Sequence, residues 1–450
     1  MESETDSDDN SQAPEPKRYV TAALASMAGT TIEWYDFFLY GSAAALIFNK
    51  IFFPSFDPLS GTLAAFATYT VGFLARPLGG IVFGHFGDRV GRKSTFLFTL
   101  LLMGIPTILL GFVPSYDSIG YWAAILLAVL RILQGLAIGG DWGGAVLTAV
   151  EHAPAGKKGF FGSLPQTGVA IGLLLSAFAL ALISKLPEKD MLSWGWRIPF
   201  IASVVLLMIG GYVRLRVSES PAFKKMKASG RIARSPVRDT LQKHLGATLK
   251  VMGARLGEVT WFYTVATFSL AYATQTLGLS KSLILDAVMW GAAVSILTIP
   301  LCGLIGDRIS QRWTFSVGAI GVILFSGYFF GMLRSGDSMV ITLAMIIAIA
   351  VVYALLYGSE GELFPNQFPP EVRYSGISLG VQVSGAIGGG LAPLVATALL
   401  KAGGGDTKYV TLYLVLLGVI ALASSWMMRK SEHRGLEMEV DAKRPSVNQL

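Results

Sequence analysis

Gly84-His85-Phe86-Gly87-Asp88-Arg89-Val90-Gly91-Arg92-Lys93 is a short, mostly polar stretch between two long apolar runs of the chain. A shorter copy, Gly303-Leu304-Ile305-Gly306-Asp307-Arg308, follows in the second part of the sequence. Both copies share the pattern Gly-x-x-Gly-Asp-Arg, and their aspartates are 219 residues apart. Because this separation is close to half of the 450-residue chain, the repeat predicts two similar halves built from membrane segments.

The composition of the chain is that of a membrane protein. Hydrophobic residues make up 53% and charged residues 14% of the sequence, whereas soluble globular chains carry about 25% charged residues. The net charge of +7 does not indicate nucleic-acid binding, because the basic residues lie between apolar runs and not on a soluble domain. The single cysteine, Cys302, lies inside an apolar run, which excludes a disulfide framework and a thiolate metal site.

Twelve apolar runs reach the length of about 20 residues that a membrane-spanning helix needs. They cover roughly 19–46, 61–86, 94–113, 119–143, 159–184, 195–216, 250–277, 281–305, 313–333, 338–362, 374–400 and 409–429. The strands of a membrane β-barrel need only about 10 alternating residues. These longer, uniformly apolar runs therefore predict an all-α membrane protein with twelve transmembrane helices.

A polar stretch at 217–249 separates the first six runs from the last six. It predicts a basic cytoplasmic linker between two pseudo-symmetric six-helix bundles, at 19–216 and 250–430. We expect this linker to lie on the anionic inner leaflet, with partner binding as the alternative. Residues 1–18 include six acidic side chains and predict a disordered tail. Residues 431–450 predict a second tail.

The basic residues are divided unequally between the two sides of the predicted membrane. The tails and connections on the side of the N-terminus hold 24 Lys and Arg residues, and the opposite connections hold seven. Since cytoplasmic segments carry the excess of basic residues, we expect both termini in the cytoplasm.

Two carboxylates lie near the middle of the first apolar run. Glu33 and Asp36 are three residues apart and share one helical face. A charge at the bilayer centre costs at least about 2.5 kcal/mol, and two close carboxylates in a medium of low dielectric do not easily both ionise. The pair is thus a candidate proton carrier. The alternative is that one of them pairs with an arginine and holds helices together.

Two arginines also lie inside predicted spans. Arg76 precedes Pro77, which removes a backbone donor and loosens the helix. Arg131 lies at the centre of the fourth run, and Arg131, Gln134, Ile138 and Asp141 form one stripe of a helix towards its cytoplasmic end. Such a stripe is typical of a face that lines a cavity.

Polar aromatic and amide side chains near mid-span extend the candidate cavity. Tyr35, Trp261 and Tyr353 are the preferred aromatic candidates, although aromatic residues are also common at membrane interfaces. Gln166 and Gln382 occupy matching places in the two halves, where a neutral amide is either a substrate contact or a bond between helices.

Further carboxylates lie on spans of both halves. Arg255 and Glu258 are three residues apart and are best read as a structural ion pair. Glu360 and Glu362 end the tenth run, and Glu362-x-x-Pro365 repeats the pattern Glu151-x-x-Pro154. We interpret these end-of-helix carboxylates as gating or packing groups.

Enzyme motifs are absent from the sequence. There is no Walker-type Gly-rich loop, in which Gly is followed directly by Lys-Ser/Thr, that would bind ATP. The four histidines show no metal-ligand spacing. We therefore expect no enzymatic activity, no metal and no cofactor.

The stretch at 84–93 resembles the signature of the major facilitator superfamily. Further motifs make the chain similar to the metabolite:proton symporter family within it: Glu33-Trp34-Tyr35-Asp36-Phe37, Arg76-Pro77-Leu78-Gly79-Gly80, Arg131-x-x-Gln134-Gly135, Gly139-Gly140-Asp141-Trp142-Gly143-Gly144, Gly162-Ser163-Leu164-Pro165-Gln166, Trp194-Gly195-Trp196-Arg197-Ile198-Pro199-Phe200 and Arg216-Val217-Ser218-Glu219-Ser220-Pro221. The resemblance runs from about residue 18 to residue 430. Members of this family carry shikimate, 2-oxoglutarate, proline, betaine and other small acids or zwitterions.

The resemblance implies alternating access, in which two halves rock about a central site in a bacterial cytoplasmic membrane. It places the residues of the repeated stretch and two further acidic residues in a cytoplasmic gate: Gly84, Asp88, Arg89, Gly91, Arg92, Asp141, Glu151, Asp307 and Arg308. In the second copy, Ile309-Ser310-Gln311-Arg312 departs from the full signature. An anionic substrate needs a buried cation, for which Arg76 and Arg131 are the candidates.

The sequence thus predicts a secondary active transporter, driven by the proton gradient, that imports a small organic acid or zwitterion of the shikimate, aromatic-acid or dicarboxylate kind. Its predicted partners are this small molecule, protons and the lipid bilayer, and we expect a monomer. Uptake of proline or betaine is an alternative. A passive facilitator and a sensor on the same scaffold are further alternatives.

Overall fold

The computed structural model describes residues 16–90, 92–139, 146–147, 149–150, 153–154, 156–216, 236–369 and 372–429. Within these ranges every regular element is a helix. The bilayer core offers no water to the backbone N–H and C=O groups of a long apolar run. A helix satisfies all of these groups within one segment, which is why the runs predicted as spans fold as helices.

The first half of the molecule comprises α1 to α10. Its elements are α1 (Pro16–Ala43), the π-helical η1 (Ala44–Phe48), α2 (Asn49–Phe52), α3 (Pro58–Val90), α4 (Arg92–Leu110), α5 (Tyr116–Ile119), α6 (Trp122–Ile138), α8 (Lys158–Ile183), α9 (Glu188–Asp190), η2 (Met191–Gly195) and α10 (Arg197–Arg216).

The second half comprises α12 to α21. Its elements are α12 (Pro236–Lys243), α13 (Leu245–Tyr263), η3 (Thr264–Phe268), α14 (Ser269–Ala271), η4 (Tyr272–Thr276), α15 (Lys281–Arg308), α16 (Gln311–Arg334), α17 (Ser338–Met345), η5 (Ile346–Tyr353), α18 (Ala354–Leu363), the short 3₁₀ turn η6 (Pro365–Gln367), α19 (Arg373–Ser384), η7 (Gly385–Gly390), α20 (Leu391–Ala402) and α21 (Lys408–Trp426).

Several spans are interrupted by π-helical turns, so a span is often a series of helices. Seven uninterrupted or directly continued helices in the described residues are long and apolar enough to cross a membrane. An eighth, at Glu188–Tyr212, is bent by 44°, and Phe98–Leu110 and Trp122–Ile138 are shorter apolar helices. With each series counted as one span, the prediction of an all-α fold with twelve membrane helices in two bundles is confirmed.

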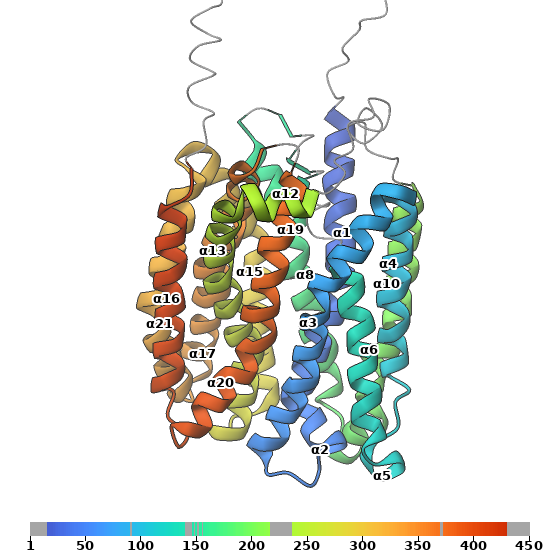
Figure 1. The fold of residues 1–450 in the computed structure, drawn as a ribbon. Helices are drawn as coiled ribbons and strands as arrows, with labels where there is room; N and C mark the ends of the chain where they lie inside the picture. Colours follow the sequence, from blue (N-terminus) through green and yellow to red (C-terminus); the bar gives the residue numbers. More distant parts are fainter. Residues whose placement is uncertain are drawn as a thin grey trace, which may run out of the picture.

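The two halves stand side by side (Figure 1). The helices α13, α16, α17, α20 and α21 form one group and α4, α6 and α10 the other, while α12 lies across one end of the molecule and α5 lies at the other end. We call these the α12 end and the α5 end. The predicted linker 217–249 contains α12 and the start of α13, and the exact bundle boundaries stay a prediction.

Glycine lets the helices approach closely. A Cβ atom on Gly135 of α6 would lie 1.8 Å from the carbonyl oxygen of Gly72 on α3, which no side chain tolerates. Since apolar side chains have no hydrophobic drive to associate in lipid, such close backbone packing supplies much of the attraction between membrane helices.

Candidate functional site

The two halves meet in the middle of the molecule through a cluster of aromatic rings, which we call the aromatic centre. Its buried members come from α1, α3 and α13: Trp34, Phe37, Phe38, Tyr69, Phe73, Phe262 and Tyr263. The ring centroids of Phe73 and Tyr263 are 5.2 Å apart and those of Phe38 and Phe262 are 5.4 Å apart. Both pairs join one half to the other, at separations where tilted and edge-on ring pairs attract.

The two arginines predicted to bind substrate both lie against this aromatic centre. The guanidinium carbon of Arg76 is 3.9 Å from the ring centroid of Phe73 and 4.1 Å from that of Phe37. The guanidinium carbon of Arg131 is 3.8 Å from the Tyr40 ring and 4.4 Å from the Phe37 ring. Phe37 thus lies beside both cations, and the ring faces offset part of the cost of burying them.

The two guanidinium groups share an open hydrogen-bonding edge. In both Arg76 and Arg131 the buried Nε and Nη2 atoms have no hydrogen-bond acceptor among the described residues. Neither arginine forms an ion pair within that part of the chain. The Nε–H and Nη2–H bonds of a guanidinium are parallel and form the fork that takes a carboxylate with two hydrogen bonds. The site therefore holds two forks suited to an organic anion.

A chain of hydrogen bonds connects Arg131 to Asp36. Nη1 of Arg131 donates to Oε1 of Gln134 at 2.8 Å, and Nε2 of Gln134 donates to the Thr107 hydroxyl at 2.6 Å. That hydroxyl lies 2.8 Å from Oδ2 of Asp36 and 3.0 Å from the Met103 carbonyl oxygen. Since a hydroxyl donates only one hydrogen bond at a time, Thr107 has a choice between the carboxylate and the carbonyl. The other carboxylate oxygen of Asp36 is buried and has no hydrogen-bond partner among the described residues.

The remaining sequence-predicted residues of α1 lie differently from Asp36. Glu33 is buried, three residues before Asp36 on the same helix. The hydroxyl of Tyr35 donates to the carbonyl oxygen of Pro199 on α10 at 3.0 Å. Tyr35 therefore fastens α1 to a helix of its own half, and its polar group is not directed to the aromatic centre.

In the second half, the predicted aromatic candidates pack among hydrophobic residues. Nε1 of Trp261 donates to the Ala348 carbonyl at 3.0 Å, which ties α13 to η5. Tyr353 stacks on Phe262 with ring centroids 4.1 Å apart, and on Tyr357 at 4.9 Å. Tyr353 is thus connected to the aromatic centre through Phe262, whereas Trp261 lies inside its own half.

The buried arginine of the second half, Arg255, pairs with two carboxylates. Nη1 of Arg255 lies 2.9 Å from Oε2 of Glu258 and 2.5 Å from Oε2 of Glu360. All three side chains are buried. The predicted ion pair between Arg255 and Glu258 is confirmed, and Glu360 of α18 completes it. This cluster is a structural support between α13 and α18.

Comparisons with known proteins agree with this arrangement. The family model for sugar (and other) transporters matches residues 21–255. The shikimate transporter of Escherichia coli (strain K12) is 42% identical over 414 residues, which are 91% of this chain and 94% of that protein. The chain belongs to the major facilitator superfamily. A proline/betaine transporter of Salmonella typhimurium (strain LT2) is 32% identical over 429 residues, 92% of this chain and 84% of the relative.

The fold of this transporter also matches a solved structure. The crystal structure of a D-xylose-proton symporter superposes with a TM-score of 0.69 at 18% sequence identity, over 92% of this chain and 99% of that one. The chain is thus a membrane-embedded transporter of a small molecule and not an enzyme.

At the α12 end of the transporter, Asp307 of the second half contacts the first turn of α8, a helix of the first half. The carboxylate of Asp307 accepts hydrogen bonds from the backbone N–H groups of Gly159 at 2.7 Å and Phe160 at 2.9 Å. These are orphan donors in the first turn of α8, which also has the positive end of the helix dipole. Asp307 therefore caps a helix of the opposite half.

The glycines of the second signature copy make this contact geometrically allowed. A Cβ atom on Gly303 would lie 2.6 Å from the Gly159 carbonyl oxygen, and one on Gly306 would lie 1.9 Å from Oε1 of Gln311. Nε2 of Gln311 in turn lies 3.3 Å from Oδ1 of Asp307 and 3.2 Å from Oε2 of Glu362. The Gly-x-x-Gly-Asp spacing brings the backbone of α15 at Gly303 against α8. It also places the Asp307 carboxylate at the N-terminus of α8. Arg308 is exposed.

The two glutamines at matching places have different contacts. Nε2 of Gln382 on α19 donates to the Gly139 carbonyl at 3.0 Å, which connects the two halves. Nε2 of Gln166 reaches the Gly162 carbonyl of its own helix at 3.4 Å, and its buried Oε1 has no partner in the described chain.

Other polar contacts join the halves at the α5 end. Nε2 of Gln275 donates to the Ala45 carbonyl at 3.1 Å and lies 2.7 Å from the Thr62 hydroxyl. Nζ of Lys401 donates to the Ser60 hydroxyl at 2.6 Å and lies 3.9 Å from Oδ2 of Asp57. The described residues therefore hold the halves together at both ends, on either side of the aromatic centre.

Several predicted gate residues lie outside the described residues. These are Gly91, Asp141 and Glu151, together with the side chains of Asp88, Arg89 and Arg92. Gly84 lies in α3.

Sequence reasoning missed Thr107, Phe37 and Gln275. Thr107 follows Pro106 inside an apolar run, and a hydroxyl in that position was the available signal. Phe37 is adjacent to Asp36, and the ring-bearing positions 34, 37 and 38 share a helical face. Gln275 is a lone amide near the end of its span, with no signal that names its partner on the other half.

Proposed function

We propose that this transporter imports a small organic anion together with a proton by alternating access. The observation that carries this proposal is the pair of buried arginine forks at the aromatic centre. An unpaired buried charge is strongly unfavourable, and a substrate carboxylate supplies the missing partner. The similarity to a shikimate transporter supports a hydroxylated or aromatic acid as the substrate.

The hydrogen-bond chain supports coupling of the anion to a proton. When Asp36 is ionised, the Thr107 hydroxyl donates to it. When Asp36 is protonated, its own O–H donates to Thr107, whose hydrogen then turns to the Met103 carbonyl. Gln134 links Thr107 to Arg131, and hydrogen bonds in such a chain polarise one another, so that arrival of the substrate at Arg131 and of the proton at Asp36 influence one another. Glu33 is the second candidate for the proton. The proton gradient supplies the energy without a cofactor.

The direction of transport follows from the proposed orientation. We place the α12 end in the cytoplasm, because the excess of basic residues lies on the side of both termini. In the proposed cycle, Asp307 releases α8 when the cytoplasmic side opens, and the contacts of Gln275 and Lys401 release when the outer side opens. Gly84, Asp88, Arg89, Gly91, Arg92, Asp141 and Glu151 stay candidates for this cytoplasmic gate. A monomer contains all these parts.

Uptake of a zwitterion such as proline or betaine is the second candidate. One of the relatives is a proline/betaine transporter, and aromatic rings are able to bind a quaternary ammonium group. In this protein, however, the ring faces of Phe37, Phe73 and Tyr40 are already in contact with arginine. The geometry therefore favours a net anion.

Uptake into proteoliposomes tests the proposal. Arg131→Gln should abolish uptake of a labelled organic acid such as shikimate, while the purified variant keeps its helical content and elution volume. Collapse of an imposed proton gradient should stop accumulation by the wild-type protein. Undiminished uptake by Arg131→Gln would remove the fork from the mechanism, and gradient-independent uptake would instead describe a passive carrier. Competition by betaine but not by organic acids would favour the zwitterion.

A further inference from the structure

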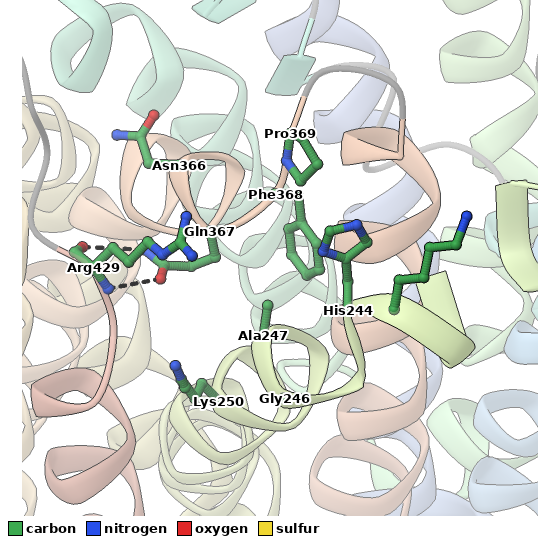
Figure 2. Close-up of a pocket in the computed structure, with 10 residues that line it drawn as sticks. His244, Gly246, Ala247, Lys250, Asn366, Gln367, Phe368, Pro369 and Arg429 are labelled. Atoms are coloured by element: carbon green, nitrogen blue, oxygen red, sulfur yellow. Dashed lines mark hydrogen bonds between the residues drawn. The ribbon is translucent and has the colours of Figure 1, made fainter. Parts of the chain in front are cut away.

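A pocket of about 500 Å³ opens at the α12 end of the second half, away from the aromatic centre. Its walls come from the corner between α12 and α13, from the turn after α18, and from the residues that follow α21 (Figure 2). It thus lies where three separate elements of the second half come together. The proposed function does not use it.

The charged groups of this pocket are all basic. Lys243, Lys250 and Arg429 line it together with His244, and none of the described lining residues is acidic. Lys243 has a nearby carboxylate, since its Nζ lies 3.3 Å from Oδ1 of Asp239 on the exposed surface of α12. Lys250 and Arg429 form no ion pair with any residue that the structure describes. Cations gathered around a cavity create a positive potential that attracts an anion.

The pocket is held in shape by hydrogen bonds to backbone. Oε1 of Gln367 accepts from the Arg429 N–H at 2.8 Å, and Nε2 of Gln367 lies 3.3 Å from the Arg429 carbonyl oxygen, as the dashed lines in Figure 2 mark. The same Nε2 lies 3.1 Å from the Leu363 carbonyl at the end of α18. The buried ring of Phe368 forms part of the wall. Arg429 is therefore fixed at the pocket by its main chain while its side chain stays available.

Apolar side chains lie on the same corner as the basic groups. Leu241 of α12 and Leu245 and Leu249 of α13 are exposed by 46%, 47% and 53%. They recur every four residues around the corner that also supplies Lys243, His244 and Lys250. An exposed leucine row beside a basic pocket at the end of a membrane bundle matches a lipid, whose acyl chains are apolar and whose headgroup phosphate is anionic.

We propose that this pocket binds a phosphate-bearing anion, namely the headgroup of an anionic phospholipid, with the phosphate near Lys250 and Arg429 and the acyl chains along the leucine row. A free phosphate compound would offer the same charge but would leave the leucines unused. A bound headgroup would connect α13, the turn after α18 and the end of α21. It should therefore stabilise the folded second half, by an amount that grows with the logarithm of the lipid concentration above the dissociation constant.

Thermal unfolding of the purified full-length protein in neutral detergent tests the proposal. Phosphatidylglycerol should raise the unfolding midpoint, whereas phosphatidylcholine should not. The double variant Lys250→Gln/Arg429→Gln should need about 25-fold more phosphatidylglycerol for the same shift, since each cation near a membrane surface contributes about 1 kcal/mol, or about fivefold in affinity. The matched control Lys185→Gln/Lys408→Gln removes the same charge from the α5 end and should respond as the wild type does.

Soluble probes distinguish the source of the phosphate. Inorganic phosphate and glycerol 3-phosphate should leave the midpoint unchanged. If either of them stabilises the wild type but not the double variant, the lipid assignment is overturned in favour of a soluble anion. If the wild type and the double variant respond equally to phosphatidylglycerol, the pocket is not the site. Should the double variant fail to fold, the single variants, each with an expected fivefold loss, and the charge-conserving Lys250→Arg, with none, decide the question.

Discussion

The two halves of this transporter treat a buried arginine in opposite ways. In the second half, Arg255 contacts two carboxylates, Glu258 and Glu360. In the first half, Nη1 of Arg131 donates to an amide, and the Nε and Nη2 atoms of Arg131 and Arg76 have no acceptor in the part of the chain that the structure describes. Halves that share a fold have therefore diverged in charge pairing. One holds a cation in place for structure, and the other keeps two cations suited to a ligand.

Matched methionine variants of the two arginines should show the largest difference between the halves. Arg255→Met leaves Glu258 and Glu360 buried without a counter-charge, and we expect a loss of about 3–5 kcal/mol in the free energy of unfolding. Arg131→Met removes a cation that forms no ion pair with any described residue, so we expect it to lose transport but to keep its stability. Thermal unfolding of both purified variants in one detergent measures the difference.

A neutralised cluster provides the control for that experiment. Arg255→Met combined with Glu258→Gln and Glu360→Gln should recover most of the lost stability, because no charge is then left unpaired. Equal destabilisation by Arg255→Met and Arg131→Met would contradict the division between the halves.

Thr107 tests whether the hydrogen-bond chain of the first half couples Arg131 to Asp36. Thr107→Val keeps the shape of the side chain but removes the hydroxyl between Gln134 and Asp36. A hydrogen bond to a charged group contributes about 1.5 kcal/mol or more, so we expect the maximal rate of proton-driven uptake to fall on the order of tenfold. The concentration of substrate at half-maximal uptake should change little.

Thr107→Ser restores the hydroxyl and should restore the rate. Exchange of labelled for unlabelled substrate without a proton gradient should be less affected than gradient-driven uptake. A Thr107→Val protein with normal gradient-driven uptake would show that the hydrogen-bond chain does not couple the two events.

Asp307 tests what the second half contributes to the first. Asp307→Asn keeps the size of the side chain but removes the charge that caps α8, which we expect to weaken the closed α12 end by about 1 kcal/mol. Labels placed at this end of the two halves should then report a larger open population, with a few-fold change in transport rate. Asp239→Asn, which removes a partly exposed carboxylate from α12 at the same end, is the control. An unchanged distance distribution would show that the cap does not hold the gate.

The parts of the fold that the sequence predicts are those set by contacts along one helix. The twelve apolar runs predict the spans, and three-residue spacing predicts both the ion pair of Arg255 with Glu258 and the common stripe of Arg131 and Gln134. Contacts between helices depend on their relative depth and rotation, which periodicity does not contain. Glu360, Thr107 and the capping of α8 by Asp307 all belong to this second class.

The smallest expected effect concerns the α5 end, where Asp57 and Lys401 face one another across the halves. Hydrogen bonds from the Ser60 hydroxyl and N–H, with a lesser contribution from Lys401, lower the pKa of Asp57 below its ordinary value of 3.8. A lowered pKa means that the ionised form stabilises the folded protein above pH 3.8 and that this contribution is lost as the pH falls below it.

Since Asp57 is exposed, we expect Asp57→Asn to lower the unfolding midpoint only slightly at pH 7 and equally at pH 5. The two proteins should converge as the pH falls below 3.8, through the lowered pKa of Asp57, and Asp117→Asn, in α5, is the control for the loss of one carboxylate at this end. A difference between the wild type and Asp57→Asn that grows as the pH falls from 7 to 5 would contradict the assigned contacts.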